Sequence, residues 1–257
     1  MKDSHVFYRR NLPHYHPAHA TFFITFRLAG SLPAEVIARL KEERRQDEKL
    51  LLSNKDRNTR RKEIGDLHKR YFANFDTLLD KAVNSPSWLR DEHVANMVAE
   101  AMHFRDKKVY DLLAYCIMPN HVHMVFAVER SGTSLYKILQ SLKSYTAREA
   151  NKLLDRSGAF WQHESYDHVV RDGKELKQVV NYVLYNPVKA GLVSSYNQWK
   201  WSYVQIASCD EPRRTTKSCA VMADGFMKQG MALCRNAEIR FYNLYCCGML
   251  FSCRPCL

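Results

Sequence analysis

The chain has 257 residues, enough for one large domain with appendages, and its formal net charge of +12 favours a polyanionic partner, nucleic acid ahead of an anionic membrane surface. It has no run of about 18 apolar residues and no signal-peptide pattern, so we expect no membrane span, no secretory leader and a cytoplasmic location. Seven of the eight cysteines lie beyond residue 208, where they cannot staple the main fold, and we expect a reduced body.

The first half of the chain predicts one strand followed by helices. Residues 21–28 are rich in β-branched and aromatic side chains, which is typical of a strand. Ser31 and Pro33 are typical of a helix start and predict a helix over 34–52, whose middle is almost wholly charged. Further helices are expected at 54–70, 76–83 and 91–105.

The second half predicts a hairpin, a helix, a strand-like stretch and a last helix. Strands at 109–118 and 121–128 flank the turn Pro119-Asn120, and Pro187 is expected to end the last helix. This order predicts an α+β sandwich with helices on one face of an antiparallel sheet. The remaining predicted elements are a helix at 134–154, an irregular to strand-like stretch at 158–170, the last helix at 173–186 and a closing segment at 199–206.

His121 and His123 form a candidate metal site in the second hairpin strand. Side chains alternate across a strand, so both imidazoles face one side of the sheet and Val122 faces the other. Two such imidazoles can chelate one divalent ion, with Asn120 and a phosphate completing the shell. A chance histidine pair on an exposed strand is the alternative. In a basic protein, the metal reading fits phosphodiester chemistry, in which the ion polarises the scissile phosphate.

The helix over 173–186 carries a candidate nucleophile. Its apolar residues recur on one side, whereas Tyr182 and Asn186 lie one turn apart on an adjoining face. An amide oxygen is a suitable third ligand for a hard cation. A phenol has a pKa near about 10 and attacks only with assistance from a metal or a base. Taken alone, the pattern more often describes an ordinary packed helix, and only its combination with the histidine pair favours a site.

Four stretches together resemble the single-tyrosine transposases of the HUH endonuclease superfamily, and most of all the REP-associated tyrosine transposases of bacteria. The resemblance covers about residues 5 to 206, and the combination is specific where no single piece is. The stretches are 18–33 with Thr-Phe-Phe-Ile-Thr-Phe-Arg-Leu, 114–125 with Met-Pro-Asn-His-Val-His, 160–168 with Phe-Trp-Gln-His-Glu together with Arg171, and 182–193 with Tyr-Val-Leu-Tyr-Asn-Pro.

The resemblance implies roles for the candidate residues. His121 and His123 match the metal ligands, Tyr182 matches the nucleophile, and Asn186 matches the amide ligand one turn later. It implies a ferredoxin-like fold, a Mg²⁺ or Mn²⁺ ion and a substrate of single-stranded DNA near hairpins of repetitive extragenic palindromes. The implied product is a 5′-phosphotyrosine link with a free 3′-hydroxyl, and the protein would be nucleoid-associated.

Two segments depart from the family pattern. Residues 1–207 are expected to form the transposase domain, with a helical insertion at about 41–96 that could serve as an oligomerisation arm, so both a monomer and a homodimer remain open. Residues 208–257 form a basic, cysteine-rich tail. Cys253 and Cys256 could be half of a zinc site, but a disordered tail or one altered by a reading-frame change is at least as plausible.

Several further residues have open roles. Tyr145 and Tyr185 are rival nucleophiles, and Tyr182 is favoured over both because of its spacing to the amide. Phe160 and Trp161 fit either the core or a base-stacking surface. The basic residues expected to contact DNA phosphates are Arg171, Lys189, Lys143 and Arg148.

The sequence thus predicts an enzyme that nicks and rejoins single-stranded DNA through Tyr182. Two alternatives remain: a catalytically inactive regulator that binds DNA or RNA hairpins, and a metal-dependent hydrolase without a covalent intermediate.

Overall fold

The computed structural model describes residues 6–9, 13–16, 19–53, 56–82, 84–128 and 134–205. The tail with Cys253 and Cys256 lies outside them. None of the helices in the described ranges is long and apolar enough to cross a bilayer. The strands are β1 (Val6–Arg9), β2 (Pro13–His16), β3 (Thr21–Leu28), β4 (Asp111–Ile117), β5 (His121–Ala127), β6 (Trp161–Val170) and β7 (Ser202–Val204), and the α-helices are α1 (Ala34–Ser53), α2 (Arg57–Asp80), α3 (Glu92–Arg105), α4 (Leu135–Leu153) and α5 (Gly173–Lys189).

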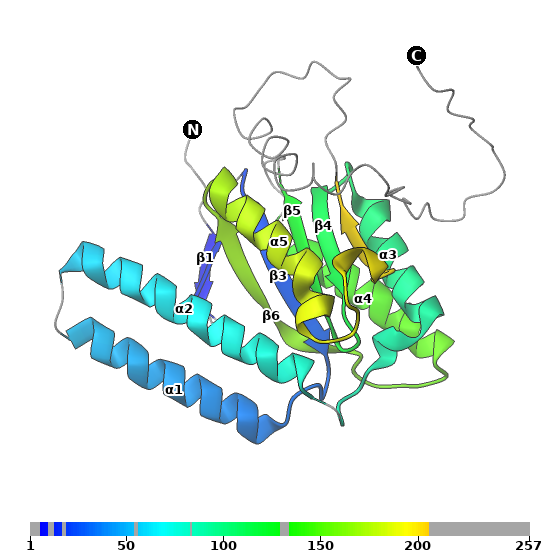
Figure 1. The fold of residues 1–257 in the computed structure, drawn as a ribbon, viewed down its shortest axis with the longest axis horizontal. Coiled ribbons are helices and arrows are strands. Elements are labelled where there is room, and N and C mark those ends of the chain that lie inside the picture. The colour runs from blue at the N-terminus through cyan, green and yellow to red at the C-terminus, as the bar shows by residue number, and fades with distance from the viewer. Residues whose placement is uncertain are drawn as a thin grey trace, which may run out of the picture. The chain divides into compact units, whose positions relative to one another are not determined.

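Five strands form one antiparallel sheet in the order β6-β3-β5-β4-β7 (Figure 1). The helix α3 connects β3 to β4 and the helix α4 connects β5 to β6, so the unit reads βαββαβ with the central pair joined as a hairpin. This is the split βαβ arrangement of ferredoxin-like folds. The predicted α+β, ferredoxin-like class is confirmed. The segment at 199–206 closes the fold as predicted, because β7 pairs with β4.

Helices cover both faces of this sheet, whereas the sequence predicted helices on one face. The helices α3 and α4 pack on the face that carries Val122, Met124 and Phe126, and α5 with part of α2 packs on the face that carries Val125 and the two histidines. Nearly every residue of β5 is buried, and a strand buried on both sides needs cover on both sides.

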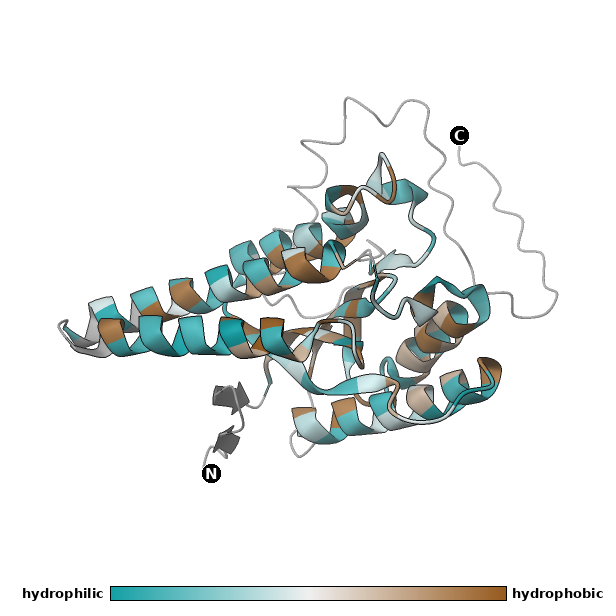
Figure 2. Cartoon of the chain, turned by 90° about the horizontal axis from the view of Figure 1, so that it is seen from below, coloured by the Kyte–Doolittle hydropathy of each residue, from teal (hydrophilic) through white to brown (hydrophobic). Residues whose placement is uncertain are grey.

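Along the chain, α1 and α2 follow β3 and precede α3. The two helices pack against each other. Both are predominantly hydrophilic, with apolar residues interspersed along them (Figure 2). The start of α2 is capped by Asp56, whose carboxylate accepts hydrogen bonds from the backbone and hydroxyl of Thr59. The sequence predicted two helices here, at 54–70 and 76–83. One continuous helix forms because no proline or glycine interrupts the chain between them, and Phe72 within it packs on the sheet.

The helix α5 begins as predicted and ends later than predicted. The Asp172 carboxylate accepts a hydrogen bond from the Glu175 backbone and caps its start. Pro187 does not end the helix, which continues to Lys189 and stops before Gly191, whose φ of 71° is in the left-handed region. A proline removes one N–H group, and so near the end of the helix only one bond is lost. The ring of Pro187 is buried against the core, which favours this arrangement.

Candidate metal centre and tyrosine site

His121 and His123 lie fully buried on the face of β5 that α5 covers. The antiparallel register places Thr25 of β3 opposite His123 and Arg27 opposite His121. The Nε2 atoms of the two imidazoles are 3.0 Å apart. Two ligands bound at about 2.1 Å and at a right angle to one ion would also be about 3 Å apart, so this spacing fits chelation.

Asn120 sets the tautomer of His121. Its amide nitrogen donates to the carbonyl of Leu79 at 2.9 Å and to the hydroxyl of Ser85 at 3.1 Å. The amide oxygen therefore faces His121 Nδ1, at 2.6 Å, and must accept a hydrogen bond from its N–H group. The lone pair of His121 is then on Nε2, which faces the site. Burial, followed by the neighbouring His123, lowers the pKa of His121 to about 3, so the ring is neutral and available as a ligand.

Thr25 contacts the outer ring nitrogen of His123, as Asn120 does that of His121. Its hydroxyl lies 2.7 Å from His123 Nδ1. Because a hydroxyl both donates and accepts, Thr25 can stabilise either tautomer of His123, including the one whose Nε2 lone pair faces the site.

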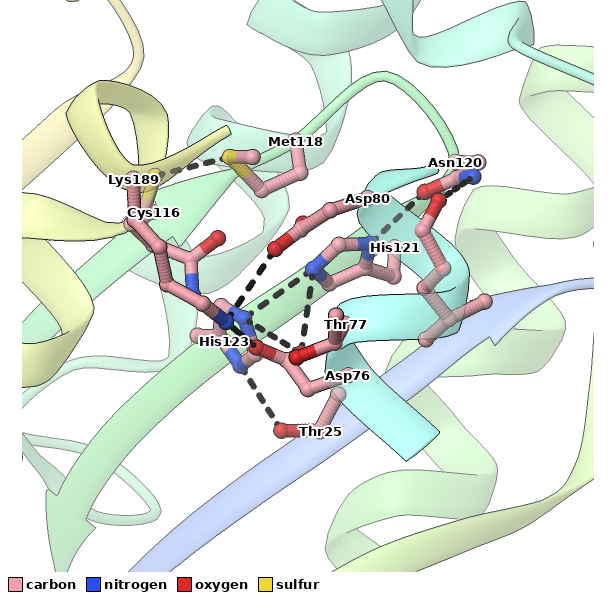
Figure 3. A network of polar contacts seen from close by, with 12 residues as sticks. Thr25, Asp76, Thr77, Asp80, Cys116, Met118, Asn120, His121, His123 and Lys189 are labelled. Atoms are coloured by element: carbon pink, nitrogen blue, oxygen red, sulfur yellow. Dashed lines mark hydrogen bonds and ion pairs between the residues drawn. The ribbon is translucent and has the colours of Figure 1, made fainter. Parts of the chain in front are cut away.

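Asp76 of α2 is the third member of the cluster, and Figure 3 shows it beside both imidazoles. Its Oδ1 lies 3.3 Å from His123 Nε2 and 3.6 Å from His121 Nε2. These three residues are all buried and form a candidate metal site of two imidazoles and one carboxylate. Carboxylate oxygen and neutral imidazole are common ligands of divalent ions in proteins.

Three side chains of α5 converge on the other carboxylate oxygen of Asp76. The Tyr182 hydroxyl donates a hydrogen bond to Oδ2, as do the Asn186 amide at 3.2 Å and the Lys189 ammonium at 3.0 Å. The Tyr182 ring also lies against His123, with centroids 5.6 Å apart. The structure therefore brings the histidine pair and the tyrosine–asparagine pair together on one side of the sheet.

The side chains around the Asp76 carboxylate shift the pKa values of one another. Burial alone would raise the pKa of Asp76, but the two histidines and the Tyr182 hydrogen bond outweigh it and hold that pKa far below its usual range. Burial, followed by the charge of Asp76, raises the pKa of Tyr182 well above 10. Burial would lower the pKa of Lys189, but Asp76 and Asp80 raise it. The phenol is therefore protonated, and the lysine is charged.

Two buried oxygens test whether a cation fits here. Among the described residues, neither Asp76 Oδ1 nor Asn186 Oδ1 has a hydrogen-bond partner. An acceptor that is buried without a donor costs about 1–3 kcal/mol. A divalent cation bound by Asp76 Oδ1 and the two imidazole lone pairs would satisfy that carboxylate oxygen, so these three residues fit such an ion.

The rival tyrosines lie elsewhere. Tyr145, on α4, is 40% exposed and contacts Arg105 and Arg148, on the far side of the sheet from the histidines. Tyr185, on α5, is 53% exposed and packs against Tyr196. Neither contacts the cluster.

The basic residues expected to contact DNA occupy different environments. Lys189 is in the cluster and also pairs with Asp80 at 3.1 Å. Arg171 is exposed at the start of α5. The Lys143 ammonium donates to the carbonyls of Gln162 and His163 at 2.7 and 3.0 Å, so it is engaged within the fold. Arg148 is exposed and pairs with Glu149 on the opposite side of the sheet.

Phe160 and Trp161 are buried in the core that α3 and α4 cover. The indole N–H of Trp161 donates to the Thr146 hydroxyl at 2.8 Å. Of the two roles considered for these rings, packing is the one that the structure shows.

Sequence reasoning did not single out Asp76. Its signal was a carboxylate in the middle of an apolar helix face, since Phe72 and Leu79 flank it at helical spacing and both are buried. A buried carboxylate is uncommon unless it is paired or binds a metal. The sequence predicts two separate helices in this segment, and two separate helices do not form the continuous apolar face that contains Asp76.

Comparison with known proteins places these residues in context. Residues 84–186 match the model of a family described as transposase IS200 like, a range that contains both histidines, Tyr182 and Asn186 but not Asp76. A solved structure of a REP-associated tyrosine transposase bound to a REP hairpin is also similar, with a TM-score of 0.41 and 16% identity over 76% of this chain and 80% of that one.

Two curated relatives carry the same description. A provisionally named REP-associated tyrosine transposase of Haemophilus influenzae is 28% identical over 102 residues, which is 36% of this chain and 58% of that protein. A REP-associated tyrosine transposase of Escherichia coli is 22% identical over 93 residues, which is 36% of this chain and 53% of that protein. The match thus spans little more than half of each relative. The resemblance found in the motifs is confirmed: residues 84–186 match the IS200-like transposase family model, and the chain is similar to two REP-associated tyrosine transposases.

Proposed function

We propose that this protein is a metal-dependent DNA strand transferase that nicks and rejoins single-stranded DNA through a covalent link to Tyr182. The observation that carries the proposal is the convergence on Asp76: the two imidazoles face one carboxylate oxygen, and the nucleophile candidate binds the other. His121, His123, Asp76 and the amide oxygen of Asn186 would hold the ion, and Mg²⁺ or Mn²⁺ suits this mainly oxygen and imidazole set. When bound, the ion would polarise the scissile phosphate.

The residues of the chain supply the remaining chemistry. The Tyr182 oxygen attacks phosphorus, a P–O bond to Tyr182 forms, and the bond to the 3′-oxygen of the preceding nucleotide breaks. The hydrogen bond to Asp76 orients the phenol, and the phenol proton ends on the leaving 3′-oxygen. Lys189 balances the charge of Asp76 and Asp80. The product is a 5′-phosphotyrosine, and attack by another 3′-hydroxyl reverses the step and rejoins the strand.

The substrate in this proposal is single-stranded DNA that carries hairpins. The relatives named for REP association and the structure bound to a REP hairpin support this class of DNA. The net charge of +12 agrees with a nucleic-acid partner. We place the protein at the bacterial nucleoid, as a monomer or a homodimer, with the exposed Arg171, just before α5, as a phosphate contact.

A pool of single-stranded DNA with hairpins and random flanks tests the chemistry. Incubation with Mg²⁺ and a denaturing gel should show that 3′-labelled DNA acquires the mass of the protein, whereas 5′-labelled DNA becomes a shorter free strand. The variant Tyr182→Phe should lose the adduct and keep binding in a native gel. The matched control Tyr185→Phe, three positions along the same helix, should form it normally.

Other outcomes assign another function. Cleavage without an adduct that survives Tyr182→Phe would indicate a hydrolase. Binding without cleavage by the wild-type protein would indicate a hairpin-binding regulator and would contradict the proposal.

A further inference from the structure

A cavity of about 60 Å³ lies beside the candidate centre, between the helix pair α1–α2 and the strands β3 and β6. It is large enough for a few water molecules or a small group such as a phosphate. Its lining combines cationic and aromatic side chains. The cations are Arg27, Lys41 and Arg44, the aromatic rings include Tyr71 and Phe75, and Glu164 is the acidic residue of the lining.

Arg27 is the buried cation of this cavity. Its guanidinium donates to the Ser31 hydroxyl at 2.9 Å and lies over the ring of Phe75, with 5.5 Å from Cζ to the centroid. Among the described residues, no carboxylate lies within ion-pair distance of it. Burial lowers the pKa of Arg27 to about 10, and the more distant Glu164 offsets this only in part. Buried charges are normally paired, so this one points to an anion from outside the chain.

The rest of the lining fits a nucleotide backbone. Lys41 pairs with Glu164 at 3.5 Å where their side chains are 39% and 30% exposed, so this pair forms the solvent edge. Arg44 lies over the ring of Tyr71 and pairs with Glu48 outside the cavity. Since Glu164 pairs with Lys41 and Glu48 pairs with Arg44, Arg27 carries the unbalanced positive charge of the lining. Cations together with aromatic faces are the usual surface for single-stranded nucleic acid.

The cavity adjoins the candidate centre through the sheet and through α2. Arg27 pairs in register with His121, and Thr25, which also lines the cavity, bonds His123. From the other side, Phe72 lines the cavity and packs against Tyr182, with centroids 6.0 Å apart. A group held at Arg27 is therefore a near neighbour of any phosphate held at the histidines.

We propose that this cavity binds a backbone phosphate of the single strand next to the scissile one, with Arg27 as its anchor and Lys41 at its entrance. The site would fix the position of the strand over Tyr182. The inference rests on the proposed function, since it assumes that a strand crosses the site. A free phosphate has the same chemistry as a backbone phosphate, so the test must separate the two.

The test measures the affinity of the full chain for a 20-nucleotide oligothymidine across a salt series, with chelator present so that no cleavage occurs. Each lost phosphate contact should reduce the slope of log K against log salt by about 0.7. We expect Arg27→Gln and Lys41→Gln each to weaken binding about tenfold at low salt and to flatten this slope. The matched control Arg39→Gln, in an exposed pair with Glu43 on α1 and outside the cavity, should leave both unchanged.

An unchanged slope in folded Arg27→Gln would overturn the proposal, and if that variant fails to fold, Lys41→Gln decides alone. If 10 mM phosphate raises the melting temperature of the wild-type protein but not of Arg27→Gln, while both bind DNA alike, the cavity is a free-anion site and the proposal is wrong. These measurements need no adduct. A flattened slope without any adduct would therefore contradict the proposed function alone.

Discussion

The phenol of Tyr182 donates a hydrogen bond to the carboxylate of Asp76, a residue 106 positions earlier in the chain and on a different helix. The same carboxylate faces His121 and His123. The nucleophile candidate and the metal candidate therefore share one residue, and changes at Asp76 should affect both.

Asp76→Asn should weaken Mn²⁺ binding by roughly 10- to 100-fold and abolish the DNA adduct, because it removes the charge that faces both imidazoles. Isothermal titration with Mn²⁺ and the denaturing gel measure the two effects. Asp66→Asn is the control, since Asp66 is an exposed carboxylate on the same helix. Equal Mn²⁺ affinity in Asp76→Asn and Asp66→Asn would remove Asp76 from the metal site.

Thr25→Val should lower Mn²⁺ affinity by roughly tenfold or more with little change in shape, because it removes the hydroxyl that supports His123 Nδ1. The folded state should persist, as valine suits a strand. Thr21→Val, at the beginning of the same strand, is the control. Should both variants bind Mn²⁺ like the wild type, the Thr25 contact has no part in ligand support.

Trp161→Ala should reduce the free energy of unfolding by about 3–5 kcal/mol, because it empties a buried site and leaves Thr146 without its indole partner. Urea unfolding followed by circular dichroism measures it. The affinity of the folded protein for oligothymidine should stay within twofold. A small stability loss combined with a large affinity loss would instead assign Trp161 to the strand-binding surface.

The half-buried ammonium of Lys143 predicts a dependence of stability on pH. Burial lowers its pKa to about 8, whereas an unfolded lysine titrates near about 10.4. Between these values the unfolded state binds more protons, so the stability of the wild-type protein should rise with pH relative to Lys143→Met. Because the side chain is partly exposed, we expect a rise of roughly 2 kcal/mol from pH 7 to pH 10. Parallel stability curves for the two proteins would contradict it.

The sequence was sufficient where a local pattern decides the structure. Strand alternation alone puts His121 and His123 on one face, and helical spacing alone puts Tyr182 and Asn186 together. The continuation of α5 past Pro187 was not predictable in this way, because it depends on the burial of the proline in the folded protein. Helices on both faces and the position of Asp76 depend on how α2 docks, and no spacing within α2 encodes its distance from β5.

Because Asp76 lies on α2, the affinity of the candidate site for a metal depends on how the α1–α2 pair packs on the sheet. The histidines are held by the sheet, but Asp76 reaches them only when α2 lies against β3 and α5, a position that Phe72 stabilises through its ring contacts with Phe23, Tyr166 and Tyr182. If the docked state is only a fraction of the population, the apparent dissociation constant for the ion rises by the inverse of that fraction. A partner that binds the exposed sides of α1 and α2 would then change the metal affinity of the candidate centre without contacting its buried ligands.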